Sequence, residues 1–235
     1  MEEKLSGIVL SATAFGENDK ILNIFTLEKG VISAGIKGVK KPTAKLRFAA
    51  EPFSFCEYVF SVKGERRTVV SASLIESFYP LRENIEKFFC GGAVLDYIRK
   101  FCREEIVSPE LFLLATETLK TLCYTDKHAQ SELAYFFIRA LKISGYGLDE
   151  SGCVECGKTP SGRIFFDAGS GGFLCENCFS GVGREINLST YLALKNIAGG
   201  GEDKDFAVKA LRLLDYFMRY RAEVVIKPLA ELIKE

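Results

Sequence analysis

Short runs of alternating apolar and polar residues fill the N-terminal part of the chain and predict β-strands. Turn residues such as Glu28-Lys29-Gly30 separate these runs. The expected strands span Gly7–Phe15, Ile21–Leu27, Val31–Ile36, Phe53–Val62 and Thr68–Ile75. Strands with no helix between them favour a small antiparallel barrel of the OB type, because closing the sheet removes its exposed edges.

The spacing of apolar residues changes after Pro80. From Leu81 onward they recur every three or four positions, which is the period of a helix with one buried face. Ser108-Pro109-Glu110 is a typical helix start, because Ser caps the first turn and Pro fits the first helical position. Further helices are expected at Ser131–Ser144, Ser189–Ile197 and Asp203–Arg221, with a last helical turn after Pro228. We therefore predict an α+β fold, with an OB-type barrel domain at residues 1–79 and a helical domain at residues 80–235.

Composition and charge narrow the classes of function. The chain has 235 residues, with 31 basic and 31 acidic side chains, so no overall charge directs it to nucleic acid or to a membrane. Its acidic start, MEEKLSGIVL, lacks the features of a secretory signal, and no window is apolar enough to span a bilayer. We expect a cytoplasmic protein whose 8 cysteines are thiols or metal ligands.

The stretch GCVECGKT, residues 152–159, matches two patterns that exclude each other. Its glycines, lysine and threonine have the spacing of a phosphate-binding loop, while Cys153 and Cys156 have the spacing of half a metal site. A phosphate loop needs a buried strand before it and a helix after it. Neither flank has that character, so we expect no bound nucleotide.

The cysteine pattern continues beyond this stretch. Cys153-x2-Cys156 is followed after 18 residues by Cys175-x2-Cys178, which is the spacing of a four-thiolate zinc ribbon. Four cysteines close the coordination shell, and the only histidine, His128, is distant in sequence. We therefore predict structural Zn²⁺ in a module at about residues 149–184. This module is acidic overall, which argues against phosphate binding by its surface.

Positive charge gathers instead in the predicted barrel. No acidic residue lies between Glu28 and Glu51, and further cations occupy the expected hairpin tip at residues 63–67. Loops and one face of an OB barrel commonly hold single strands, with aromatic rings stacking on bases. The candidate stacking residues are Phe48, Phe55 and Tyr58. The candidate nucleic-acid contacts are Lys37, Lys40, Lys41, Lys45, Arg47, Arg66 and Arg67. Alternatively, the lysine loop is only solvated and the aromatic rings fill the barrel core.

The helix expected at Asp203–Arg221 carries a second, weaker candidate surface. Lys209, Arg212 and Arg219 share one face of this helix at 100° per residue. A basic stripe of this kind could extend a nucleic-acid path. An ordinary exposed helix face explains the stripe equally well.

Two segments together resemble a known family. GENDKILNIFTLEKGVISAGIKGVKKPTAK followed by EPF, and ISGYGLDESGCVECGK followed by GGFLCENC, are similar to the bacterial RecO recombination mediators. The resemblance covers nearly the whole chain. It implies an OB domain, a helical domain with an embedded zinc module, and a role in DNA repair without catalysis.

The resemblance also implies partners. RecO proteins bind single- and double-stranded DNA and anneal complementary strands. With RecR they help RecA to displace the single-stranded-DNA-binding protein (SSB), whose acidic tail docks on the helical domain. The resemblance gives a DNA-contact role to the loop Lys37–Arg47, and it matches no individual residue to the tail-binding surface.

Two other classes of protein remain as alternatives. A zinc-ribbon transcription or translation factor would use the ribbon surface to contact nucleic acid or a protein partner, but the acidic module argues against the former. An ATP-dependent enzyme would rest on GCVECGKT alone. The chain shows no Ser/His/Asp set and no recognisable carboxylate pair, which favours a protein that is not an enzyme.

Overall fold

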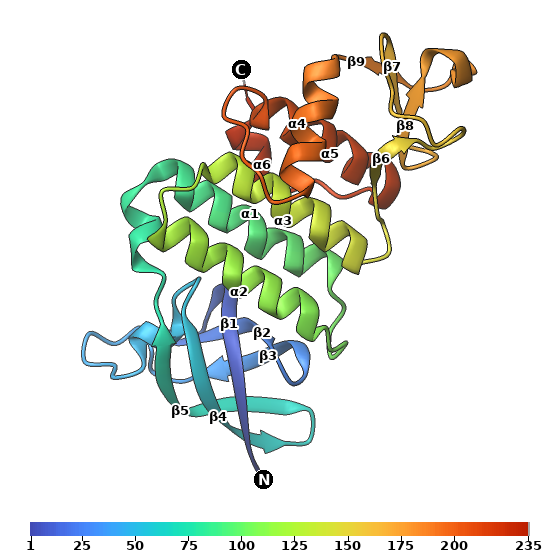
Figure 1. The fold of residues 1–235 in the computed structure, drawn as a ribbon. Helices are drawn as coiled ribbons and strands as arrows, with labels where there is room; N and C mark the ends of the chain where they lie inside the picture. Colours follow the sequence, from blue (N-terminus) through green and yellow to red (C-terminus); the bar gives the residue numbers. More distant parts are fainter. Residues whose placement is uncertain (235) are drawn as a thin grey trace. The chain divides into compact units, whose positions relative to one another are not determined.

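The computed structural model describes residues 1–234, and the chain divides into two compact units. We call Met1–Glu83 with Leu95–Thr116 the barrel unit, and Asn84–Val94 with Glu117–Glu235 the helical unit. Two long helices, α1 (Ile85–Phe101) and α2 (Pro109–Tyr124), contribute residues to both units. Both helices follow the five barrel strands along the chain (Figure 1). The predicted fold class is confirmed, because a closed five-stranded barrel precedes a set of helices with a small cysteine-bearing sheet.

The barrel closes in the strand order β1-β2-β3-β5-β4. Its strands are β1 (Glu2–Phe15), β2 (Asp19–Thr26), β3 (Gly30–Ile36), β4 (Phe55–Lys63) and β5 (Arg66–Glu76). Alternate residues point inward and form one buried core that includes Leu5, Val9, Leu22, Ile24, Tyr58 and Phe60. All neighbouring strands are antiparallel except β3 and β5, which are joined only by the parallel pair Gly35 and Thr68. The barrel is therefore least tightly closed between β3 and β5.

The first strand is longer than its local pattern indicates. The sequence predicts its start at Gly7, whereas β1 begins at Glu2 because residues 2–8 pair with β4 from Ser61 to Phe55. A shift in register between Val9 and Ser11 lets the same strand pair with β2 over its second half. The first half of β1 thus pairs with β4 and its second half with β2. The alternation of residues within β1 does not indicate this pairing.

The connection between α1 and α2 packs on the edge of β3 within the barrel unit. Glu104 forms a parallel bridge with Val31, and the N–H of Glu105 donates to the Val31 carbonyl at 3.0 Å. Gly30 has a φ of 66°, and a Cβ there would overlap the backbone of Ile106. Glycine at position 30 therefore meets two needs: it adopts the positive φ of the β2–β3 turn, and it leaves space for the backbone of the α1–α2 connection.

The helical unit contains four further helices and a small sheet. The helices are α3 (Ala129–Ile143), α4 (Leu188–Ala198), α5 (Ala207–Ala222) and α6 (Lys227–Leu232). Helix α5 packs against α3 and α4, as its apolar stripe predicts. It begins four residues later than expected, because the Asp203 carboxylate accepts the Phe206 N–H at 2.8 Å in a separate turn. No helix in the described part of the chain is long and apolar enough to cross a membrane.

The small sheet lies between α3 and α4 in the sequence and has the strand order β6-β8-β7-β9. Its strands are β6 (Asp149–Cys153), β7 (Ile164–Asp167), β8 (Gly172–Cys175) and β9 (Arg184–Ile186). A Gly-rich turn joins β7 to β8, and Gly171 there has a φ of 76°. This hairpin returns the chain so that the second cysteine pair lies beside the first.

Candidate metal centre and nucleic-acid interface

Each cysteine pair lies at the end of a strand of the small sheet. Cys153 ends β6, and Cys156 lies in the turn that follows. Cys175 ends β8, and Cys178 ends the short 3-10 helix η3 (Glu176–Cys178). The first turn is tight because the N–H of Gly157 donates to the Cys153 carbonyl at 2.7 Å. Gly157 adopts a φ of 72°, which favours glycine at this position.

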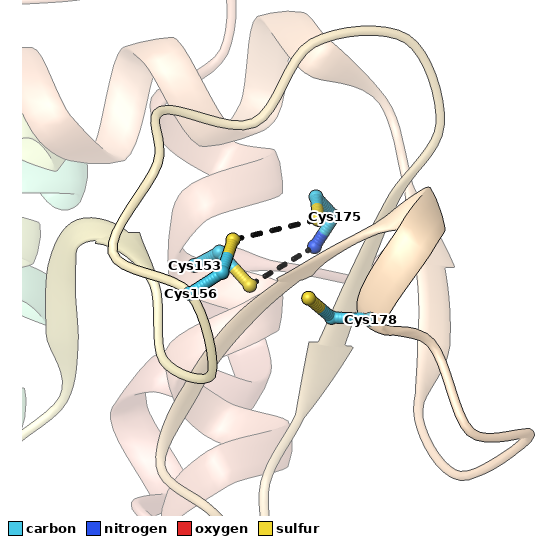
Figure 2. Close-up of side chains that lie close together, drawn as sticks. All are labelled: Cys153, Cys156, Cys175 and Cys178. Carbon is cyan, nitrogen blue, oxygen red and sulfur yellow. Dashed lines mark hydrogen bonds between the residues drawn. The ribbon is translucent and has the colours of Figure 1, made fainter.

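All four cysteine side chains converge on one point. Their sulfur atoms lie within 4.8 Å of one another, and Figure 2 shows two of them coming from each turn. The sulfurs of Cys156 and Cys175 are 3.9 Å apart, far beyond a disulfide bond. Zinc–sulfur bonds of about 2.3 Å in a tetrahedron require sulfur atoms about 3.8 Å apart. The cluster therefore has the ligand number and spacing to hold a metal ion.

The electrostatics of the cluster favour a cation at its centre. Although burial alone would raise it, the pKa of Cys153 falls to about 6, because backbone N–H groups including that of Cys175 donate to its sulfur. Hydrogen bonds with the Cys175 and Cys156 sulfurs raise the pKa of Cys178 to about 12. The sulfurs thus accommodate one negative charge more easily than several. A divalent cation is what would keep all four deprotonated.

The apolar cluster beside the cysteines is small. Phe165 and Leu174 are buried beside Cys153 in this cluster, and Phe165 stacks on Phe179 with ring centroids 3.7 Å apart. The guanidinium of Arg163 lies over Phe165 and pairs with Glu185 at 2.8 Å. The other face of the sheet is also buried, since Phe166 packs on Phe217 of α5 and Phe173 on Tyr191 of α4. A bound metal would therefore add stability mainly on the side that carries the cysteines, where the apolar cluster is small.

The GKT part of GCVECGKT leads into an irregular segment. Residues 157–162 contain no helix, and the only strand directly before them is the short β6. The strand–loop–helix arrangement of a phosphate loop is thus missing from this described segment, as the flanking residues predict. The first two cysteines of the cluster organise this segment instead.

A groove of about 530 Å³ lies on the barrel at its loosest junction, between β3 and β5. Three segments line it: the β1–β2 hairpin, the end of β3 and the tip of the β4–β5 hairpin. The groove brings together three residues from the predicted nucleic-acid set, although they are distant in sequence. The lining side chains with charge or an aromatic ring are Phe15, Asp19, Lys20, Lys37, Glu65, Arg66 and Arg67.

The three predicted cations in this groove differ in their availability. Lys37 and Arg66 are exposed, and neither has an ion pair within residues 1–234. Arg67 is only 14% exposed and is held by Glu3 and Glu105 at 3.1 and 2.9 Å. Burial alone would lower the pKa of Arg67, but these two carboxylates raise it above its usual value. Arg67 therefore serves the barrel structure, while Lys37 and Arg66 are available to meet an anion.

The lysine loop carries the remaining predicted cations outside the groove lining. Lys40, Lys41, Lys45 and Arg47 are all exposed, and no ion pair within residues 1–234 includes them. Two hydrogen bonds join the start of this loop to the β1–β2 hairpin. The N–H of Gly38 donates to Asp19 at 2.7 Å, and that of Lys40 donates to the Asn18 carbonyl at 3.0 Å.

The predicted stacking residues have partners inside the barrel unit. Tyr58 is fully buried and donates to the Ala49 carbonyl at 2.9 Å, as the alternative of a core role expects. Phe48 packs against the barrel core, and Phe55 meets Phe112 edge-on at 5.7 Å. Sequence reasoning missed Phe15, which is 60% exposed and lines the groove. Its position at the end of a strand, directly before Gly16, is the signal that could have indicated a hairpin-tip aromatic.

The weaker candidate face on α5 has partners of its own. Lys209 is exposed, with its ammonium 4.9 Å from the centroid of the Phe206 ring. Arg212 donates to the Ile233 carbonyl at 3.1 Å, and Arg219 pairs with Asp215 at 2.7 Å. Lys209 and Arg212 line a cavity of about 280 Å³, and Arg184 is another of its lining residues. Two of the three predicted cations therefore have structural partners.

These features define a class of protein: an OB-type barrel with exposed cations in a groove, followed by helices and a four-cysteine module that could hold a metal ion. The model described as "Recombination protein O N terminal" matches residues 1–78, and "Recombination protein O C terminal" matches residues 82–229. The chain belongs to the RecO family of DNA repair proteins.

Curated relatives named "DNA repair protein RecO" agree with this assignment. The relative from Acetivibrio thermocellus is 33% identical over 186 residues, which cover 79% of this chain and 74% of that protein. The relative from Anaeromyxobacter sp. (strain K) is 30% identical over 207 residues, covering 84% and 80%. The relative from Bacillus pumilus is 27% identical over 228 residues, covering 96% and 82%. The similarity therefore extends across both the barrel and the helices.

Proposed function

We propose that this RecO-family protein binds single- and double-stranded DNA through its barrel unit and anneals complementary strands without a covalent reaction. The observation that carries the proposal is the clustering of exposed cations on one part of a chain with no net charge. Lys37 and Arg66 line one groove, and the lysine loop that begins at Lys37 adds four more exposed cations. Such a local concentration of positive charge suits a polyanion.

Annealing requires little beyond this charge. Two complementary strands repel each other, and a protein that neutralises phosphates on both lowers that repulsion while leaving the bases free to pair. The groove is a natural position for one strand, and the loop cations would hold phosphates at its side. Annealing by this route consumes no nucleotide, so the proposed activity is that of a binding protein and not of an enzyme.

The helical unit would supply the other contacts of a recombination mediator. As the family resemblance implies, we assign RecR and the acidic tail of SSB as direct partners and RecA as an indirect one. These partners place the protein at the nucleoid, in the cytoplasm. We assign none of the α5 cations to a particular partner, because two of them already have structural partners.

The metal that we propose for the cysteine cluster is structural Zn²⁺. Four thiolates at tetrahedral spacing suit zinc, and they leave no coordination position for a water molecule or substrate. Cys153, Cys156, Cys175 and Cys178 would hold it. Its role would be to join β6 and β8 in a module whose apolar cluster beside the cysteines is small.

The experiment that tests the proposed function is annealing of complementary oligonucleotides coated with SSB, in the absence of nucleotide. We expect the protein to accelerate annealing, and ATP to change the rate by less than about two-fold. The triple variant Lys40→Ala, Lys41→Ala, Lys45→Ala should anneal more slowly at the same protein concentration. A protein that leaves the annealing rate unchanged, or that requires ATP, would refute the proposal.

A further inference from the structure

Phe15 is the aromatic side chain that lines the barrel groove. It is the last residue of β1 and faces Asp19 across the β1–β2 hairpin. Its side chain is 60% exposed, and it lines the groove that also contains Lys37 and Arg66. A single exposed apolar side chain is ordinary on a protein surface, so it is the position of Phe15 among the cations of the groove that indicates a ligand.

The fold itself does not require an aromatic residue there. Within residues 1–234 the Phe15 ring has no ring neighbour, whereas Phe25, Tyr58 and Phe60 fill the interior of the barrel unit. The adjoining turn is made by Gly16, whose φ is 61° and around which space is open. Any residue that tolerates the end of a strand would serve the hairpin. The ring is therefore available to a ligand.

The surroundings of Phe15 select the kind of ligand. Lys37 and Arg66 offer cations for phosphates, and the Asp19 carboxylate, which would repel phosphate, accepts the Gly38 N–H at 2.7 Å. Glu65 is the remaining acid of the groove and lies at the tip of the β4–β5 hairpin. An aromatic face beside two cations suits an anionic chain with flat rings, which is the chemistry of a polynucleotide.

We propose that Phe15 is a base-stacking platform that makes the barrel groove selective for single-stranded over duplex DNA. This inference rests on the proposed function and adds to it a residue and a preference. A base of a single strand can unstack and lie on the Phe15 ring while its flanking phosphates contact Lys37 and Arg66. The bases of a duplex are already stacked and paired, so a duplex offers the groove phosphates but no free base face.

Substitution of Phe15 tests this directly. Phe15→Ala should weaken binding of a single-stranded oligonucleotide by about 5- to 150-fold, since stacking on one aromatic contributes that range. Phe15→Leu should show most of the same loss, because leucine is apolar but has no π face. Binding of a duplex should change less than about two-fold in either variant. Both variants should keep the thermal stability of the parent protein, because Phe15 is exposed.

A fluorescent variant gives a second, independent measurement. The chain contains no tryptophan and 9 tyrosines, so Phe15→Trp introduces a single tryptophan at the platform, which can be excited at wavelengths where tyrosine does not absorb. Its emission should be quenched on addition of single-stranded DNA and unchanged by an abasic strand of the same length. Equal single-strand affinity in Phe15→Ala and the parent, or equal losses with single strand, duplex and abasic strand, would overturn the stacking role alone. If the parent protein binds no single-stranded DNA, the proposed function fails together with this inference.

Discussion

The guanidinium of Arg67 donates from Nε to a carboxylate oxygen of Glu3 at 3.1 Å, inside the barrel unit. Glu3 lies near the start of β1 and Arg67 near the start of β5. The Glu3 carboxylate also pairs with Lys29, and the Arg67 guanidinium with Glu105. The four side chains form one network that joins two strands of the barrel to the β2–β3 turn and to the α1–α2 connection.

This network predicts different effects for two adjacent arginines. Arg67→Ala should lower the free energy of unfolding by about 1–3 kcal/mol, because Glu105 loses its cation and the largely buried Glu3 carboxylate keeps only Lys29. Arg66→Ala should change stability by less than about 0.5 kcal/mol, since Arg66 is exposed. Arg66→Ala should lower the affinity for DNA more than Arg67→Ala does. Chemical denaturation and oligonucleotide binding of both variants measure this, and a larger stability loss in Arg66→Ala would contradict the assignment.

The same network predicts a dependence of stability on pH. Burial alone would raise the pKa of Glu3, but Lys29 and Arg67 hold it below the ordinary 4.5. A carboxyl with a lowered pKa in the folded state stabilises the protein above the ordinary value, and this contribution is lost as the pH falls below it. The stability difference between the parent and Glu3→Gln should therefore be constant near neutral pH and shrink as the pH falls below the ordinary 4.5. A difference that grows on acidification would contradict this.

Gly30 provides a test of how the α1–α2 connection is held. Gly30→Ala should destabilise the protein by more than about 2 kcal/mol, because the new Cβ would overlap the Ile106 carbonyl in addition to the strain of a positive φ. Gly16→Ala is the matched control, since Gly16 has a similar φ of 61° in open space. The control should cost only about 1 kcal/mol. Equal losses in the two variants, measured by thermal unfolding, would show that the close approach is unimportant.

The cysteine cluster predicts a stoichiometric metal. Cys175→Ser should lose most of its bound zinc and unfold at a lower temperature, because one of four ligands is removed from a module whose apolar cluster beside the cysteines is small. Cys102→Ser is the control, since Cys102 lies outside the cluster. The control should keep one zinc per chain. Elemental analysis of both purified proteins decides the matter, and full zinc retention in Cys175→Ser would contradict the assigned ligand.

The lysine loop predicts a change in salt dependence. Each phosphate contact on single-stranded DNA contributes about −0.7 to the slope of log affinity against log salt. Replacing Lys40, Lys41 and Lys45 by Ala should therefore make the slope shallower by about 2. A control that replaces Lys120, Lys142 and Lys204, which are exposed in the helical unit, should leave the slope unchanged. Equal slopes in the two triple variants would remove the loop from the binding surface.

Local sequence patterns predicted the type and approximate bounds of most elements. Alternation in β2 and β3 and the Ser108-Pro109 start of α2 depend on neighbours in the chain, so they can be recognised locally. The extension of β1 to Glu2 depends on pairing with Ser61, and the position of the α1–α2 connection depends on Val31. Such contacts between distant residues leave no local pattern.

The same distinction explains which site residues could be predicted. The four cysteines have a characteristic spacing because each tight turn needs its two ligands close in sequence. Arg66 and Arg67 look alike in the sequence, and only the folded positions of Glu3 and Glu105 separate them. Phe15 was missed because an aromatic at the end of an apolar run resembles a core residue until its exposure is known.

The central claim is that the exposed cations of the barrel unit bind a nucleic-acid backbone. Its most direct test is fluorescence anisotropy of a labelled single-stranded oligonucleotide, titrated with the parent protein over a series of salt concentrations. If about five cations contact phosphates, binding should be tight in dilute buffer, and log affinity should fall against log salt with a slope of about −3.5. Absence of binding at low salt, or an affinity that does not change with salt, would contradict the claim.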